Sequence, residues 1–230
     1  MISYIVALYR SDVYEIMAGP CLRQQELMYD AQVILVEGAE SIYAAYEEGR
    51  QRAEHYTHVY VHDDAAILEL DATPKILQEF RNRQAQLMGV VGARGEKLPW
   101  WTNEHLMGGW AGIRRDKRLW WNYGASGATL AEQYNGTQRP IENRQTRAKY
   151  DDLSVDWLDG IFLAEQTDLP WPEREAGLWH GYDAERCLQV RKAGGSVKLC
   201  DVAVAHWNQR HGKGHMEGHA KVMAQLREEI

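Results

Sequence analysis

The sequence predicts an α/β fold in which a mixed, mostly parallel sheet is flanked by helices. Two β-branched strands, at residues 32–36 and 58–61, enclose a helix rich in Ala, Glu and Arg that Ser41 caps and that runs to about His55. Strand, helix and strand with short connections is the order of parallel βαβ units. A further buried strand, residues 2–8, comes before them. Ligands of such sheets bind beyond the carboxyl ends of the strands, so the polar residues that follow each strand are the first candidates for a site.

The rest of the chain continues this pattern around one irregular region. After the first strand we expect a loop from Tyr9 onward. Residues 95–150 contain Trp pairs and several Gly clusters, which predict loops and short strands. All 230 residues are expected to form a single domain. The other predicted elements are a helix at 74–83, a strand at 87–92, regular structure at 155–164, a helix at 182–193, a strand at 196–206 and a terminal amphipathic helix at 215–229.

Composition excludes several classes of protein. The longest apolar stretch is too short to span a bilayer and no signal segment precedes it, so we expect no membrane span and a cytoplasmic location. The three cysteines have no paired spacing, which argues against a disulfide framework or a zinc knuckle. A net charge of -7 argues against general binding of nucleic-acid phosphates. Nine Trp and twelve Tyr against two Phe favour rings that can also hydrogen-bond, which suits a polyhydroxylated ligand.

The strongest local signal is the triplet His62-Asp63-Asp64 at the end of a predicted strand. Adjacent acids there are tolerated where they face solvent or a cation, and a Mg²⁺ or Mn²⁺ ion that bridges two phosphates needs few protein oxygens. A solvated turn is the alternative interpretation. Arg10 and Glu37 follow two other strands and are expected on the same rim.

A second signal is the block at residues 179–188, which is followed by Gly194-Gly195, an apolar strand and His206. Asp183 lies at the start of a predicted helix, where the helix dipole favours its ionised form and suits it to act as a base. The alternative is a helix-capping carboxylate without chemistry.

In this order and at these separations, the motifs resemble the GT-A fold of family-2-like glycosyltransferases, the Rossmann-like nucleotide-diphospho-sugar transferases, and most closely the StrF-type domain branch. The resemblance rests on residues 41–66, 155–164 and 179–206. It implies a metal-dependent inverting glycosyltransferase that moves a sugar from a nucleotide-diphosphate donor, first of all a UDP-sugar, to an acceptor hydroxyl. It also implies Mn²⁺ or Mg²⁺ as cofactor. We expect a saccharide or small-molecule acceptor rather than nucleic acid, bound on the side of the Trp-rich residues 95–150.

The resemblance also suggests roles for single residues. Asp183 matches the general base, and the metal ligands are expected to be Asp64, His206 and His62. For the nucleotide we assign Tyr9, Arg10, Glu37, Ser41, Tyr46 and Asp63. For the sugar and acceptor we assign Asp159, Gly160, Trp110 and His180. Two positions depart from the family pattern: His62 replaces the first acid of the metal motif, and Glu47 replaces the Asn that commonly follows the helix tyrosine.

Three alternatives stay open. A metal-dependent phosphoesterase could draw ligands from the triplet, His180 and His206, although two-metal hydrolases use further carboxylate and histidine clusters. A non-catalytic nucleotide-sugar-binding module is compatible with the two departures. A transferase acting on a hydroxymethylated base of phage-type DNA is supported by the basic residues at 114–118 and the Trp pair at 120–121, but the base would have to leave the duplex.

Overall fold

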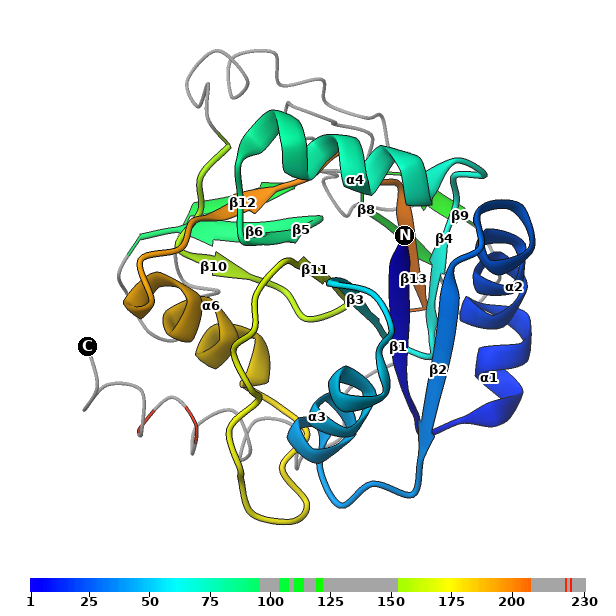
Figure 1. Cartoon of the computed structure of the whole chain (residues 1–230), viewed down its shortest axis with the longest axis horizontal. Coiled ribbons are helices and arrows are strands. Elements are labelled where there is room, and N and C mark those ends of the chain that lie inside the picture. The colour runs from blue at the N-terminus through cyan, green and yellow to red at the C-terminus, as the bar shows by residue number, and fades with distance from the viewer. Residues whose placement is uncertain are drawn as a thin grey trace, which may run out of the picture.

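The computed structural model describes residues 1–95 and 153–207, the backbone of three short strands between them, and residues 222 and 224. Its main sheet has six strands in the order β12-β5-β11-β3-β1-β2 (Figure 1). Only β11 runs against the others in this sheet, so the prediction of a mixed, mostly parallel sheet is confirmed. The strands are β1 (Ile2–Leu8), β2 (Gln32–Glu37), β3 (Thr57–Val61), β5 (Leu87–Gly89), β11 (Phe162–Glu165) and β12 (Val197–Leu199).

Helices cover both faces of this sheet, because its central strands are apolar on both sides. Ile5 and Tyr60 pack on one face, while Tyr4 and Val59 pack on the other, as the two-residue repeat of a strand requires. In Figure 1, α3 and α6 lie on the first face, and α2 and α4 lie on the second. The helices are α1 (Ser11–Ile16), α2 (Ala18–Tyr29), α3 (Ile42–Arg52), α4 (Ala72–Arg83) and α6 (Tyr182–Lys192).

Two smaller sheets complete the described part of the chain. One has the order β10-β6-β7 and the other β4-β13-β8-β9. The second sheet positions residues of the candidate site, because β4 begins directly after the His62-Asp63-Asp64 triplet and pairs with the last described strand, β13. The strands are β4 (Ala65–Ile67), β6 (Val91–Arg94), β7 (Glu104–Met107), β8 (Trp110–Ile113), β9 (Leu119–Trp121), β10 (Trp157–Leu158) and β13 (Val204–Trp207).

Four predicted elements differ from the structure. The prediction of a loop after β1 is wrong, since the chain forms α1 and α2 there. Gly19 and Pro20 resemble a turn, but they lie in the first turn of α2, where the missing N–H of proline is tolerated. Each predicted strand at 87–92 and 196–206 is in fact two strands in different sheets, and the segment 155–164 is likewise divided between β10 and β11. Local sequence patterns do not show which sheet a strand joins, because strands of both sheets are largely buried.

The helix predicted at 182–193 is confirmed as α6, which ends before Gly194 at a positive φ of 79°. Of the terminal helix predicted at 215–229, only Val222 and Ala224 lie within the described residues, and both are helical.

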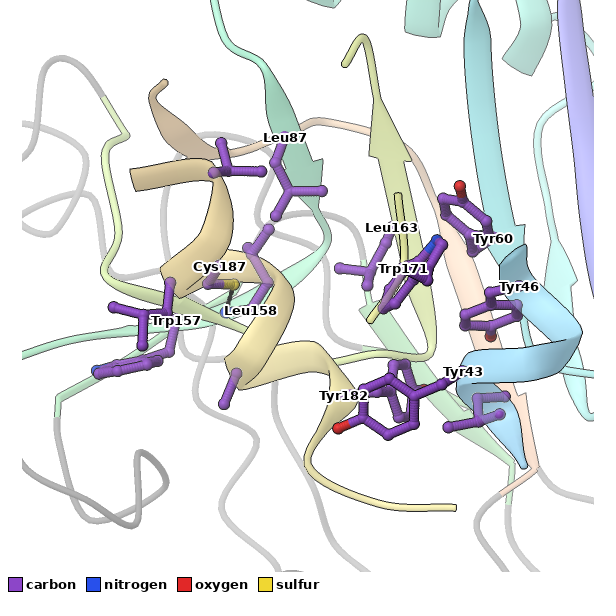
Figure 2. Packing of buried hydrophobic residues seen from close by; sticks show 14 of the residues in the cluster. Tyr43, Tyr46, Tyr60, Leu87, Trp157, Leu158, Leu163, Trp171, Tyr182 and Cys187 are labelled. Carbon is purple, nitrogen blue, oxygen red and sulfur yellow. Dashed lines mark hydrogen bonds between the residues drawn. The ribbon is translucent and has the colours of Figure 1, made fainter. Parts of the chain in front are cut away.

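A buried ion pair joins α6 to the sheet. Arg186 and Glu165 are both 0% exposed, and two hydrogen bonds of 2.7 Å join the guanidinium to the carboxylate. Tyr60 donates a third hydrogen bond to Glu165, and Arg186 also donates to the carbonyl oxygen of Leu169 and stacks over the ring of Trp171. Figure 2 shows the rings of Tyr60 and Trp171, which both contact this pair. The network fixes α6, and therefore its first turn, against β3 and β11.

Replacing Arg186 by Met leaves Glu165 buried without its partner, so we expect the free energy of unfolding to fall by about 3–5 kcal/mol. Urea denaturation followed by far-UV circular dichroism measures this loss. The matched control is Arg52→Met, which breaks an exposed pair with Glu48 and should cost at most about 1 kcal/mol. Equal losses in the two variants would contradict a stabilising role for the buried pair.

Candidate functional site

The ends of β1 and β3 are held together by the middle residue of the triplet. Asp63 accepts hydrogen bonds from the backbone N–H groups of Tyr9 (3.2 Å) and Arg10 (2.7 Å) through Oδ2. The two strands run parallel, so residues that follow each of them reach the same edge of the sheet. The Asp63 side chain is buried and used in this contact, which gives it a structural role in place of the predicted nucleotide contact.

The pairing of β4 with β13 brings the C-terminal histidine to the same edge. Ala65 lies opposite His206 in this antiparallel pair. As a result, Nε2 of His206 lies 3.3 Å from Oδ1 of Asp64, and Nδ1 of His62 lies 3.8 Å from the same oxygen. One potential ligand atom from each of the three residues lies within 4.8 Å of the others. The three predicted metal ligands therefore meet in space.

Charge is balanced around Asp64. Nη2 of Arg10 donates a 2.7 Å hydrogen bond to Oδ2, on the other side of the carboxylate from the two imidazoles. Burial would raise the pKa of Asp64, but His206, His62 and Arg10 hold this pKa well below its ordinary value. Burial would lower the pKa of His206, yet Asp64 raises it above its ordinary value. A carboxylate and two imidazoles in this arrangement form a donor set suited to a divalent transition metal.

The first turn of α6 also contacts the candidate site. Tyr182 forms a hydrogen bond with Nε2 of His62 through its hydroxyl. The turn between β10 and β11 passes beside it, and Oδ1 of Asp159 accepts a 3.0 Å hydrogen bond from the N–H of Ile161 within that turn. Residues of α6, β3 and this turn are thus close neighbours at the carboxyl edge.

Asp183 is buried next to Tyr182, and its environment differs from the one expected. It lies inside α6 rather than at the cap, which is Gly181, and its Oδ1 accepts a 2.9 Å hydrogen bond from the N–H of Ala184. Burial first, and then the charge of Asp159, raise the pKa of Asp183 to about 7. The expectation that the helix dipole favours the ionised form of this acid is wrong, because desolvation exceeds the effect of the backbone N–H groups.

The predicted nucleotide residues fall into two groups. Tyr9, Arg10 and Glu37 lie at the carboxyl edge, and Tyr9 is 78% exposed. Ser41 and Tyr46 are buried instead: Ser41 accepts a 3.1 Å hydrogen bond from the N–H of Ala44 as the cap of α3, and Tyr46 lies among the core rings of Figure 2. The structure corrects these two assignments, because neither side chain reaches the surface.

The predicted sugar-side residues are also separated. Asp159 is half-buried at the edge, close enough for its charge to act on Asp183. Gly160 has a packing role, since a Cβ there would lie 2.0 Å from the Tyr182 hydroxyl. His180 is half-buried one residue before Gly181. The side chain of Trp110 lies outside the described residues, although its backbone pairs with Val204 in β13.

Three further residues contribute to the site or to its support, although the sequence assigned no contact to them. Tyr182 forms a hydrogen bond with His62. The ring centroid of Trp179 lies 5.9 Å from that of Tyr9. Glu47 accepts hydrogen bonds from the N–H of Trp171 (2.9 Å) and from the side chain of Arg50. Tyr182 and Trp179 lie in the block at 179–188 that the sequence singled out, so their position was a usable signal. Glu47, one of the two departures from the family pattern, ties α3 to the segment that precedes α6.

Comparison with known proteins gives a consistent result. Residues 24–225 match the model of a family described as a glycosyltransferase like family. No curated protein matches the sequence. Among the residues described, no helix combines the length and apolar character needed to cross a membrane.

Several solved structures share the fold. Mannosyltransferase PcManGT from Pyrobaculum calidifontis, in complex with GDP-Man and Mn²⁺, has 13% identity and a TM-score of 0.54 over 98% of this chain and 64% of that chain. GalNAc-T7 with UDP, GalNAc and Mn²⁺ has 11% identity and a TM-score of 0.52 over 97% and 47%. S. aureus TarS 1-349 in complex with UDP-GlcNAc has 10% identity and a TM-score of 0.50 over 94% and 60%. The chain spans about half to two thirds of the length of these structures, and the predicted GT-A fold is confirmed.

The raised pKa of Asp183 makes stability depend on pH. The folded chain keeps the Asp183 proton up to about pH 7, while the unfolded chain releases it near the ordinary pKa of 3.8. The protonated carboxyl group therefore contributes its full share of the free energy of unfolding below pH 3.8, and this share is lost as the pH rises from 3.8 to 7. We expect Asp183→Asn to remove a slope of up to about 1.4 kcal/mol per pH unit from the free energy of unfolding. Urea denaturation at a series of pH values measures it. The exposed Asp168 provides the control Asp168→Asn; identical slopes for the two variants would contradict the assignment.

Proposed function

The chain belongs to the glycosyltransferase-like family, and from this premise we propose that it is a metal-dependent, inverting glycosyltransferase that uses a nucleotide-diphosphate sugar. The observation that carries the proposal is the meeting of Asp64, His62 and His206 at the carboxyl edge of the sheet. We propose a UDP-sugar as the donor to test first, and a saccharide or small-molecule hydroxyl as the acceptor.

The three residues would hold a divalent cation, which would neutralise the charge that grows on the diphosphate leaving group. Arg10 keeps Oδ2 of Asp64 occupied, so Oδ1 remains for the cation between the two imidazoles. Two nitrogen ligands favour Mn²⁺ over Mg²⁺, which prefers an all-oxygen shell. The GDP-Man and UDP complexes of structural neighbours also contain Mn²⁺, which supports this choice.

Asp183 is proposed as the general base. In its deprotonated form it would take the proton of the acceptor hydroxyl while the acceptor oxygen forms a bond to the anomeric carbon. The bond from that carbon to the diphosphate oxygen would break at the same time, and the nucleoside diphosphate would leave with its electron pair. Attack from the face opposite the diphosphate inverts the anomeric configuration. A pKa of about 7 is suited to this role, since it allows both protonation states near neutral pH.

The exposed ring of Tyr9, packed against Trp179, is a proposed surface for the nucleoside base. It lies directly before Arg10 and beyond the end of β1, and aromatic faces stack well on flat bases. Glu37, exposed at the end of the neighbouring strand β2, is proposed to accept hydrogen bonds from the nucleoside.

The rival functions differ in products. Within the described residues a single group of three possible metal ligands occurs, which favours one cation over the pair that a two-metal phosphoesterase uses. Incubation with nucleotide sugars and Mn²⁺ should release nucleoside diphosphate by slow hydrolysis. Binding without release would favour a non-catalytic module, and phosphate release from simple esters would favour a phosphoesterase. Transfer to hydroxymethylated DNA is the test of the DNA alternative, whose basic residues at 114–118 lie outside the described residues.

We expect Asp64→Ala and His206→Ala each to weaken Mn²⁺ binding by at least about 10-fold and to reduce release of nucleoside diphosphate to a similar extent, because each removes one of three ligands. Isothermal titration with Mn²⁺ and a product assay measure the two effects. The matched control is Asp71→Ala, at the cap of α4 and away from the site. Unchanged Mn²⁺ affinity in both site variants would rule out the metal assignment.

We expect Asp183→Asn to lower the rate of sugar transfer by about 10²–10⁴-fold, because the amide cannot accept the acceptor proton. Mn²⁺ binding and donor binding should stay unchanged, which separates loss of the base from loss of the fold. Steady-state kinetics with saturating donor provide the measurement. Near-normal transfer by a folded Asp183→Asn protein would show that another group is the base.

A further inference from the structure

We propose that Tyr182 is a positioning residue which fixes the imidazole of His62 so that Nδ1, and not Nε2, faces the cation. This inference rests on the proposed metal site, and it concerns a residue that lies outside the donor set. Three observations support it: one hydrogen bond, one packing constraint and the distances around Asp64.

The two nitrogens of His62 have different partners. Nε2 is engaged by the Tyr182 hydroxyl, while Nδ1 lies 3.8 Å from Oδ1 of Asp64 on the side of His206. An imidazole offers one nitrogen to a metal and commonly donates the N–H of the other to an oxygen, which fixes its tautomer and its orientation. With a cation at Nδ1, Nε2 of His62 would therefore carry the hydrogen and donate it to the Tyr182 oxygen.

Tyr182 is itself held firmly in place. Its ring is buried among the edges of Tyr43 and Tyr46, with ring centroids 6.4 Å and 5.5 Å away, and Figure 2 shows it beside Tyr43 and below Trp171. Gly160 leaves space for its hydroxyl, because a Cβ at this position would lie 2.0 Å from the hydroxyl oxygen and 2.3 Å from the ring carbon that carries it. The hydroxyl cannot turn away from His62 without displacing these neighbours.

Its place in the chain adds a second constraint. Tyr182 is the first residue of α6 and follows Gly181, whose positive φ of 83° suits glycine. A Cβ on Gly181 would lie 2.6 Å from Val222. The start of α6 is therefore confined on both sides, and the buried pair of Arg186 with Glu165 fixes the next turn of the helix. A rigid support of this kind holds a metal ligand in its productive orientation.

The test is Tyr182→Phe, which keeps the ring and removes the hydroxyl. The matched control is Tyr43→Phe, which removes an equally buried hydroxyl from a neighbouring ring that is not the hydrogen-bond partner of His62. Long-range ¹H–¹⁵N spectra of the metal-free protein report which nitrogen of His62 carries the hydrogen, and His62→Gln assigns the signal. Titration with Mn²⁺ alone gives the affinity.

We expect wild type and Tyr43→Phe to show a single tautomer of His62, and Tyr182→Phe to show a mixture of both tautomers with Mn²⁺ affinity about 10–100-fold weaker. Gly160→Ala should weaken Mn²⁺ binding similarly, because its methyl group displaces the hydroxyl. A mixture of tautomers in wild type, or a Tyr182→Phe protein with wild-type spectra and affinity, would overturn the proposal.

The two readouts separate this inference from the proposed function. If wild type binds no Mn²⁺, the metal assignment fails, and the spectra of the metal-free protein still decide whether Tyr182 sets the His62 tautomer. If wild type binds Mn²⁺ through Asp64 and His206 but Tyr182→Phe binds it equally well with an unchanged tautomer, the proposed function stands and the positioning role is wrong.

Discussion

The antiparallel pairing of β4 with β13 brings together two segments that are far apart in the chain. Ala65, directly after the His62-Asp63-Asp64 triplet, lies opposite His206, and this register alone places an imidazole 3.3 Å from the Asp64 carboxylate. Since side chains alternate along a strand, a slip of one residue would direct His206 to the other face of the small sheet. The candidate metal site therefore depends on this short strand pair as well as on β3 of the large sheet, which ends directly before His62.

Two buried aspartates at this edge show how the surroundings decide the behaviour of the same side chain. Asp64 has Arg10 on one side and two imidazoles on the other, so its pKa is held well below the ordinary value despite burial. Burial first, and then the charge of Asp159, raise the pKa of Asp183 to about 7, and no cation is among the main influences on it from the described part of the chain. A ligand that must stay ionised and a base that must exchange a proton thus occupy neighbouring places, because positive charge gathers around only one of them.

Among the described residues, most of the large aromatic rings lie in the core. Tyr43, Tyr46, Tyr60, Trp171 and Tyr182 pack against one another between α3, α6 and the sheet (Figure 2). Tyrosine is used where phenylalanine would also fill space, because the hydroxyls of Tyr60 and Tyr182 reach Glu165 and His62. The same layer thereby joins the buried ion pair to the site. The expectation that aromatic rings serve the ligand remains a proposal, and among the described residues it concerns the exposed ring of Tyr9 and the half-buried ring of Trp179.

By itself, the sequence determined the fold class, most of the main-sheet strands, helices α3 and α6, and the residues of the candidate metal site, because hydrophobic periodicity and the residues at strand ends are local properties. It also led to the family through motifs in a fixed order. Only the tertiary structure decided that residues 87–92 and 196–206 divide between sheets, that Ser41 and Tyr46 are buried, and that Tyr182 reaches His62. The tertiary structure also decided that the pKa of Asp183 is raised, whereas its place at the start of a helix had predicted that the ionised form is favoured. These features arise from contacts between segments distant in the chain and from the desolvation that such contacts impose, and no local pattern of residues records either of them.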